Sequence, residues 1–184
     1  MRKLLNSELD RKTIAEYKNS DKSPFIIVLD NVRSHNNVGS IFRTADAFLV
    51  ETIYLCGITA QPPHRDIQKT ALGATESVPW RYFSATSDAV KELKSNGVVL
   101  MAIEQVEGAI MLQDLIIEHG KKYAFIFGHE INGVSQDIID LCNFCIEIPQ
   151  FGSKHSFNIA VSAGIVLWEA NKKGLHTQPF TKND

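Results

Sequence analysis

Three groups of polar residues and glycines follow apolar runs in the sequence. The first, residues 31–48, reads NVRSHNNVGSIFRTADAF and places Asn37 and Ser40 where an expected helix begins, with Arg43 on the same polar face as Ser40. Free N–H groups at a helix N-terminus suit anions and polar ligands, and an arginine there suits a phosphate or a ribose. The same residues also fit an ordinary capped helix in which Arg43 pairs with Asp46.

The second and third groups also carry residues suited to contact a ligand. GHEING, residues 128–133, places two glycines around Glu130, which permits a tight turn and close approach of a ligand to the backbone. IPQFGSKHSFNIAVSAGI, residues 148–165, places Ser156 and Asn158 at the entrance of an apolar helix, where polar side chains need partners. The alternative is simple capping, with Ser156 as the N-cap. A serine hydrolase is not indicated, because the G-x-S-x-G turn is absent.

The hydrophobic pattern alternates between strand-like and helix-like segments that would position these groups. Uninterrupted apolar runs predict strands at 25–30, 52–56, 98–104, 123–128 and 144–149. Apolar residues at three- and four-residue spacing predict helices at 37–49, 88–95, 136–141 and 157–172, the last apolar around most of its circumference and therefore largely buried. Ser7 and Asp10 have capping-box spacing and predict a helix over 7–19. A proline-containing loop with room for a short helix follows residue 56, and residues 110–119 are ambiguous.

Strands that alternate with helices predict an α/β domain with a mainly parallel sheet and helices on both faces. We assign residues 1–22 to an N-terminal helical extension and residues 23–184 to the domain. In such folds ligands bind beyond the carboxyl ends of the strands. The three polar groups follow strands, so they are the candidates for a ligand site.

The composition excludes several classes of protein. Of 184 residues, 44% are apolar and 22% are charged, which suits one folded domain and not a disordered chain. No run approaches the roughly 18 apolar residues of a membrane span, and the first residues have no apolar signal core. The net charge of −2 speaks against binding of nucleic acid by bulk charge, so such binding needs a local basic patch. Neither a P-loop nor a G-x-G-x-x-G turn is present.

The three cysteines, an odd number, point to a reducing cytoplasm. Cys142 and Cys145 form a C-x-x-C, a spacing that zinc and redox sites use. A structural zinc site needs four ligands, and no second Cys or His pair has suitable spacing. The favoured interpretation is that both cysteines pack as small apolar residues where a helix end runs into a strand.

Taken together, the three groups resemble the signature motifs of the SpoU (TrmH) family of S-adenosylmethionine-dependent RNA ribose 2′-O-methyltransferases, in the SPOUT superfamily. Motif one resembles N-x-G-x-x-x-R-T-A, here Asn37, Gly39, Arg43, Thr44 and Ala45. Motif two resembles G-x-E-x-x-G, here Gly128, Glu130 and Gly133. Motif three resembles I-P, two or three residues, G, three residues and S-[LF]-N, here Ile148, Pro149, Gly152, Ser156, Phe157 and Asn158. The resemblance covers nearly the whole chain, and its departures are Phe157, where Leu is commoner, and Gln150-Phe151, where Met is frequent.

The resemblance implies S-adenosylmethionine as cofactor, a C-terminal trefoil knot and a homodimer. From the residues themselves, we expect no metal and no membrane partner. It assigns cofactor contacts to Ile103, Glu104, Gly128, Ile148, Ser156 and Phe157, and catalytic positions to Asn37, Arg43, Glu130, Ser156 and Asn158. In this family an arginine, here Arg43, is often described as the general base. Guanidinium, however, stays protonated in proteins. The more conservative hypothesis is that Arg43 binds the adjacent phosphate and stabilises the developing alkoxide.

The implied substrate is RNA and not DNA, since the reaction needs a 2′-hydroxyl. Candidate contacts are the basic residues Arg11, Lys12, Arg33, Arg43 and Lys154. A nearly lone catalytic domain with a short helical extension favours tRNA, with a guanosine ribose in the D-loop as the target. The alternatives are ribosomal RNA, the tRNA wobble ribose, a catalytically silent RNA-binding factor on the same fold, and an unrelated small-molecule α/β enzyme. The expected location is the cytoplasm.

Overall fold

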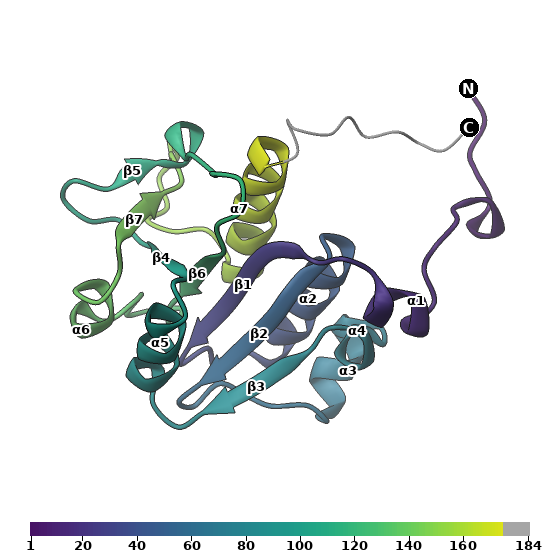
Figure 1. Ribbon diagram of the computed structural model, residues 1–184, viewed down its shortest axis with the longest axis horizontal. Coiled ribbons are helices and arrows are strands. Elements are labelled where there is room, and N and C mark those ends of the chain that lie inside the picture. The colour runs from purple at the N-terminus through teal and green to yellow at the C-terminus, as the bar shows by residue number, and fades with distance from the viewer. Residues whose placement is uncertain (175–184) are drawn as a thin grey trace.

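Seven strands form one parallel sheet in the computed structural model, which describes residues 1–174 (Figure 1). Their order across the sheet is β3-β2-β1-β6-β4-β7-β5, and every pairing is parallel. The strands are β1 (Ser23–Asp30), β2 (Val50–Cys56), β3 (Trp80–Phe83), β4 (Val99–Ile103), β5 (Ile110–Met111), β6 (Tyr123–Phe127) and β7 (Phe144–Glu147). The mainly parallel sheet predicted from the sequence is therefore confirmed.

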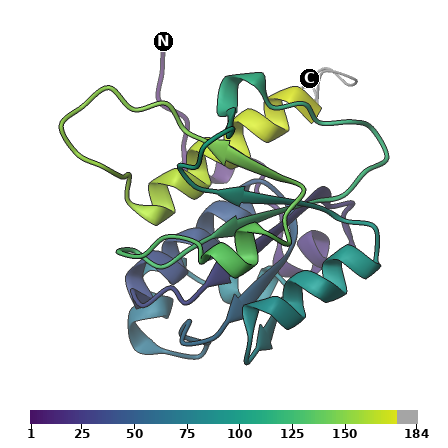
Figure 2. The same cartoon turned by 90° about the vertical axis from the view of Figure 1, so that its left-hand side faces the viewer.

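Helices cover both faces of the sheet, as predicted. They are α1 (Ile14–Asn19), α2 (His35–Ala47), α3 (Arg65–Ala71), α4 (Ala74–Ser77), α5 (Thr86–Ser95), α6 (Gln136–Ile139) and α7 (Ile159–Gly174), with the 3₁₀ turns η1 (Asn6–Glu8) and η2 (Leu112–Asp114). Figures 1 and 2 show α2 and α7 on one face and α5 and α6 on the other. No helix within residues 1–174 is long and apolar enough to cross a membrane.

The central strand β1 explains this layering. Its side chains alternate between the two faces, so Ile27 and Leu29 join the core under α2 and α7, whereas Ile26 and Val28 join the core under α5 and α6. All four are buried, and full burial of such a side chain stabilises a fold by roughly 1.5–3 kcal/mol. A strand buried on both faces reads as an unbroken apolar run, which is why the sequence revealed it.

The N-terminal helix is shorter than predicted. Residues 7–13 do not belong to it: Asp10 has a φ of 43°, which interrupts a right-handed helix, and α1 begins at Ile14. The capping box is formed by Thr13 and Glu16, not by Ser7 and Asp10. The extension docks through the buried Tyr17, whose hydroxyl donates to the carbonyl of Val50 at 3.3 Å.

Two strands of the sheet were not predicted from the sequence. β3 was not predicted, because this edge strand is only partly buried and its residues WRYF show no apolar run. In the ambiguous segment 110–119, the structure has the two-residue strand β5 followed by η2. The proline-containing loop contains α3 and α4, and the remaining predicted elements lie within a few residues of their expected bounds.

Helix α7 differs from its prediction at its start and on its outer face. The cap is Asn158, whose Oδ1 accepts the backbone N–H of Ala160 at 2.9 Å, and not Ser156. One side of α7 is buried, but Val161 and Trp168 are 51% and 61% exposed, so the expected burial around most of the helix is wrong for this single chain.

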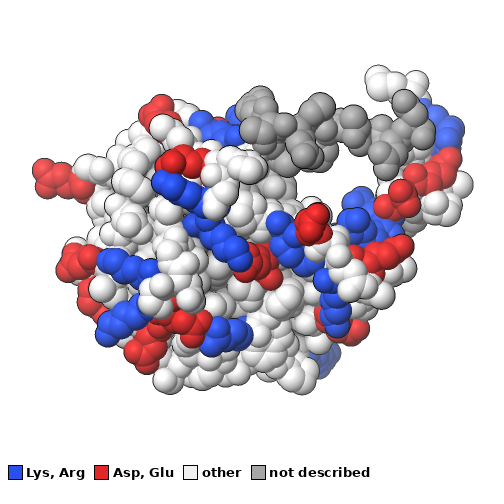
Figure 3. All heavy atoms as spheres, in the orientation of Figure 1, with Lys and Arg blue, Asp and Glu red and all other residues white. Residues whose placement is uncertain are grey.

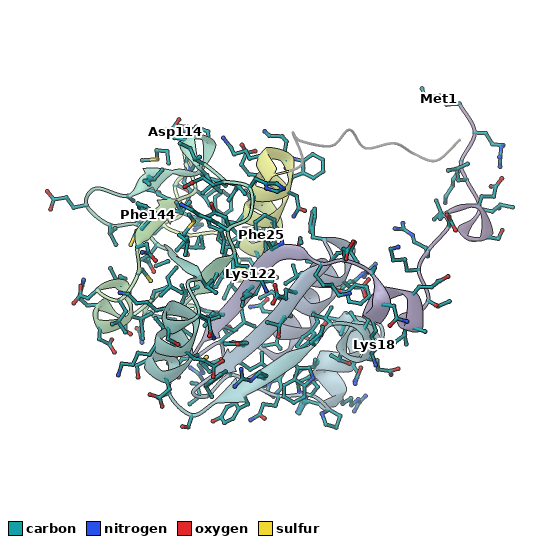
Figure 4. The ribbon with its side chains drawn as sticks, in the orientation of Figure 1. Met1, Lys18, Phe25, Asp114, Lys122 and Phe144 are labelled. Atoms are coloured by element: carbon teal, nitrogen blue, oxygen red, sulfur yellow. The ribbon has the colours of Figure 1, made fainter. Side chains whose placement is uncertain are left out.

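Phe144 on β7 and Lys18 on α1, both labelled in Figure 4, lie on the left and right sides of the molecule in that view. On the face drawn in Figure 3, acidic and basic side chains are interspersed without a large patch of one sign. Residues 175–184 of the predicted domain 23–184 lie outside the described residues.

Candidate functional site

A cavity of about 530 Å³ opens at the carboxyl ends of β4, β6 and β7. This is the edge at which ligands bind in parallel α/β sheets. Its wall consists of Ile103, Glu104, Gln105, Phe127, Gly128, His129, Glu130, Ile131, Asn132, Gly133, Ile146, Glu147, Ile148, Gln150, His155, Ser156, Phe157, Asn158, Ile159 and Ser162. Motifs two and three, which are distant in the sequence, therefore line one space.

The motif-two loop, residues 128–134, is closed by its own backbone. His129 and Gly133 exchange two backbone hydrogen bonds, of 3.0 and 2.8 Å. A Cβ on Gly128 would lie 2.1 Å from the carbonyl carbon of Gly133, so the two ends of the loop meet where only glycine fits. Gly133 has a φ of +66°, and a Cβ there would lie 2.0 Å from Glu104 Oε2. Both glycines of G-x-E-x-x-G thus have a steric reason.

Glu104 anchors this loop from the end of β4. Its Oε2 accepts the backbone N–H of Val134 at 2.9 Å, and its Oε1 accepts the N–H of Gln105 at 2.9 Å. Both carboxylate oxygens are therefore engaged in holding backbone, although the residue also lines the cavity. Glu104 is predicted to contact the cofactor, and the structure gives its carboxylate a role in fixing the loop as well.

Glu130 joins motif two to the segment before motif one. Its carboxylate accepts the backbone N–H groups of Arg33 at 3.1 Å and Ser34 at 2.9 Å. Partial burial raises the pKa of Glu130, but the N–H groups, with a further hydrogen bond from the Asn37 side chain, outweigh it and hold that pKa below its usual value. Glu130 is therefore ionised at neutral pH.

Asn37 connects all three motifs. Its side chain donates to Glu130, and its Oδ1 accepts the side-chain N–H of Asn158 at 3.1 Å. It lies in the first turn of α2, where Ser34 caps the helix by accepting the N–H of Asn37. One side chain of motif one is thus fixed by one residue of each other motif.

The segment between β7 and α7 forms an open loop, visible in yellow-green in Figure 2. Residues 151–158 are all exposed, and Phe151 is 98% exposed. The loop is held to the end of β4 by Gln105, whose side-chain N–H donates to the carbonyl of His155 at 3.1 Å. Gln105 was not predicted from the sequence, although its position directly after a strand was the available signal.

The structure brings most predicted site residues together, but not all. All six predicted cofactor residues line the cavity, and so do the predicted catalytic residues Glu130, Ser156 and Asn158. Asn37 reaches the cavity wall only through its partners, and Arg43 is exposed on α2 outside that wall. Among the predicted RNA contacts, Arg33 and Lys154 belong to segments beside the cavity, whereas Arg11 and Lys12 precede α1 at the other end of the sheet (Figure 1).

Arg43 does not pair with Asp46, as it would in the alternative of an ordinary capped helix. Asp46 accepts a hydrogen bond from the Ser77 hydroxyl, and within residues 1–174 Arg43 forms no ion pair or hydrogen bond. An exposed guanidinium without a partner among residues 1–174 remains available to a ligand.

The C-x-x-C cysteines lie where α6 ends and β7 begins. Burial raises the pKa of Cys142 to about 12 and also raises that of Cys145, so both are neutral thiols at physiological pH. Both pack against the core under α5 and α6 as small apolar side chains. No group of three or more potential metal ligands occurs in the part of the chain that the structure describes.

Comparison with known proteins gives a consistent result. A model of the SpoU rRNA methylase family matches residues 24–168. The 23S rRNA (guanosine-2′-O-)-methyltransferase RlmB of Neisseria meningitidis serogroup B is 28% identical over 156 residues, which are 85% of this chain and 61% of that protein. This chain spans about three fifths of the length of the curated relatives it matches.

Solved structures agree on the fold. An AdoMet-bound rRNA methyltransferase from Sinorhizobium meliloti is 27% identical and has a TM-score of 0.76, covering 83% of this chain and 57% of that one. The TrmH/SpoU tRNA modifying enzyme from A. aeolicus has a TM-score of 0.77 at 23% identity, covering 92% of this chain and 87% of its own.

Proposed function

The chain belongs to the SpoU rRNA methylase family, and we propose that it transfers a methyl group from S-adenosylmethionine to the 2′-hydroxyl of an RNA ribose. One observation carries this proposal: motifs two and three line one cavity, and Asn37 of motif one contacts both Glu130 and Asn158 in its wall. A silent binding factor would not need these three polar side chains to be held together.

The cavity wall fits this cofactor. S-adenosylmethionine supplies an electrophilic methyl group on a positively charged sulfur. A volume of about 530 Å³ lies in the usual range for small-molecule sites. The side chains of Ile103, Ile146 and Ile148 suit an adenine ring, and the carboxylates Glu104 and Glu130 suit a cation. We propose cofactor contacts at Ile103, Glu104, Gly128, Ile148, Ser156 and Phe157.

The remaining residues are proposed to position the RNA. Ser156 and Asn158 lie in the cavity wall and have the polar groups needed to orient a ribose. Alignment of the 2′-oxygen alone is worth roughly 7–11 kcal/mol. The proposed role of Arg43 is to bind the adjacent phosphate and to stabilise the negative charge on the 2′-oxygen as its proton leaves. Arg33 and Lys154 lie beside the cavity and are proposed to bind neighbouring phosphates.

A homodimer accounts for two features of the single chain. Val161 and Trp168, seven residues apart on α7, present an exposed apolar face of the kind that marks an interface. Arg43 lies outside the cavity wall. We propose that two copies pair through this face of α7 and that each copy brings its Arg43 to the cavity of the other.

A trefoil knot is proposed for the C-terminal segment. β7 is inserted between β4 and β5, and the chain then returns through α7 to the connection between β5 and β6. There Lys173 Nζ donates to the carbonyl of Gln113 at 2.6 Å. This return path supports a C-terminal segment threaded through that connection, as the family resemblance implies.

The proposed substrate is tRNA in the cytoplasm, with a guanosine ribose in the D-loop as the target. Ribosomal RNA is the second candidate, because a relative covering most of this chain is named for a 23S rRNA guanosine. The wobble ribose of tRNA is the third. All three share the chemistry of a 2′-hydroxyl next to a phosphodiester.

The test is methyl transfer to separate RNA pools. The protein is incubated with S-adenosylmethionine labelled in the methyl group and with tRNA or rRNA that lacks modifications, and the labelled ribose is mapped. We expect label in one pool at one nucleotide, resistant to alkali at the adjacent phosphodiester. The Arg43→Ala variant serves as control and is expected to bind the cofactor but to transfer no methyl group. Absence of label from every pool would overturn the enzymatic proposal.

A further inference from the structure

Two histidine rings stack on the surface beside the candidate site. His35 begins α2, His64 caps α3, and their ring centroids lie 3.9 Å apart with an interplanar angle of 33°. His64 is exposed and His35 is half-buried. Neither ring takes part in the contacts among the three motifs, so the site described above does not explain the pair.

The rings are held in place, unlike most surface side chains. Nδ1 of His64 accepts the backbone N–H of Asp66 at 3.2 Å, which fixes that ring. The two helices are also joined to each other, because the hydroxyl of Thr70, near the end of α3, donates to the carbonyl of Asn36 in the first turn of α2 at 3.0 Å. Gly39 on α2 packs so closely on α3 that a Cβ would lie 2.3 Å from the carbonyl oxygen of Ile67. The stack is therefore preorganised.

The stack stands next to the motif-two carboxylate. His35 directly follows Ser34, whose backbone N–H donates to Glu130 at 2.9 Å. Arg33 precedes the cap of α2, Arg65 is the first residue of α3, and both are exposed. Within residues 1–174 neither guanidinium forms an ion pair or hydrogen bond. A fixed pair of rings with free cations beside it matches the two components of single-stranded nucleic-acid binding, base stacking and phosphate contact.

We propose that the His35–His64 stack is a binding site for an unpaired nucleobase of the RNA substrate, adjacent to the nucleotide that is methylated. The proposal rests on the proposed function, because it needs an RNA at the motif-two loop. His64, the more exposed ring, continues the stack with the base, while Arg33 and Arg65 contact phosphates. Aromatic side chains including histidine are common stacking partners of unpaired RNA bases.

A metal site does not explain the pair. The lone pairs of imidazole nitrogens lie in the ring plane, so two stacked rings do not direct them at one ion. Nδ1 of His64 is also occupied by the N–H of Asp66.

Two variants of His64 separate stacking from helix capping. His64→Phe keeps an aromatic ring but removes the cap, whereas His64→Asn keeps a cap acceptor but removes the ring. We expect His64→Phe to bind unmodified tRNA and a fluorescent single-stranded RNA oligonucleotide within about twofold of the wild type, and His64→Asn about tenfold more weakly. His119→Ala, an exposed histidine elsewhere, is the control with no expected change.

Salt dependence distinguishes the rings from the cations. Loss of a phosphate contact in Arg65→Ala lowers the slope of log K against log salt by about 0.7, whereas His64→Asn leaves the slope unchanged. Equal binding by His64→Asn and the wild type, or equally weak binding by both His64 variants, would overturn the stacking site alone. Failure of the wild type to bind any RNA would overturn the proposed function with it.

Discussion

The side-chain amide of Asn158 donates a hydrogen bond to Asn37 Oδ1 at 3.1 Å, although 121 residues separate the two along the chain. At the same time Asn158 Oδ1 accepts the N–H of Ala160 and caps α7. The residue thus uses a donor and an acceptor together, and of the common capping residues only asparagine has both in one planar group. The side chain of Asn37 in turn interacts with the carboxylate of Glu130.

The first prediction concerns a variant of Asn158 that keeps the cap of α7 but loses the hydrogen bond to Asn37. Asn158→Asp keeps the capping acceptor but loses the donor to Asn37, and it places a second negative charge near Glu130. We expect kcat/KM to fall at least about tenfold, because the donor to Asn37 is lost. Tm should change little, because the capping acceptor remains. In a double-mutant cycle with Asn37→Ala, the two changes should show a coupling of about 0.5–1.5 kcal/mol in kcat/KM. Strictly additive effects would contradict the bridge.

The glycines of motif two provide a second prediction. Gly133→Ala puts a Cβ against Glu104 in a left-handed conformation, so it should destabilise the protein by about 1–2 kcal/mol and lower Tm by roughly 2–8 °C. Gly152→Ala is the matched control, since a Cβ there would meet nothing within 4 Å. Thermal unfolding of both variants checks the difference. An equal Tm would contradict the close approach seen at Gly133.

The sequence located this loop but not its anchors. Polar residues after apolar runs were sufficient to place motifs two and three, because parallel strands end at one edge of the sheet. The contacts of Glu104 and Gln105 were not predictable, since they depend on which strands are neighbours, and β4 lies beside β6 and β7 only after folding. Motif spacing also gave no sign that Arg43 would stand outside the cavity wall.

The same reasoning explains the errors in the elements. Central strands such as β1 are buried on both faces and were visible as apolar runs. The edge strand β3 buries little. The N-terminal helix begins at Ile14, and not near Ser7, because its cap Thr13 is held by hydrogen bonds with Glu16. Which strand lies at the edge of the sheet and which residue caps a helix depend on three-dimensional geometry, and the spacing of apolar residues in the sequence does not reveal it.

Glu104 supplies a third prediction. Glu104→Gln retains one carbonyl oxygen but turns an NH₂ group toward one of the two backbone N–H donors. We expect the amide of Val134 to exchange with solvent about tenfold faster in the protein without cofactor, and cofactor binding to weaken by a similar factor. Glu107→Gln, an exposed carboxylate nearby, is the control. Unchanged exchange at Val134 would mean that Glu104 does not hold the loop.

The pH dependence of Glu130 is the fourth prediction. Its pKa in the folded protein is lowered by backbone N–H groups and Asn37 that outweigh its burial, so its charge stabilises the fold above the unfolded pKa of about 4.3. That contribution is lost as the pH falls through the folded pKa. The difference in free energy of unfolding between the wild type and Glu130→Gln should therefore be constant from about pH 5.5 to 8 and shrink below about pH 4. Urea denaturation at each pH measures it, and a difference that grows on acidification would contradict the assignment.

The position of Arg43 leads to the last prediction, which concerns the proposed dimer. Heterodimers are prepared by co-expressing two differently tagged chains, one carrying Arg43→Ala and the other Asn158→Asp. If Arg43 serves the cavity of the other copy, both defects fall on one site and the second site is intact, so about half of the wild-type rate per dimer is expected. The reciprocal heterodimer, wild type with a chain carrying both changes, should then retain at most about a tenth of the wild-type rate, because each site has one defect. The opposite pair of results would place Arg43 at the cavity of its own chain. The rate of both heterodimers is measured as methyl transfer to the RNA identified in the pool assay.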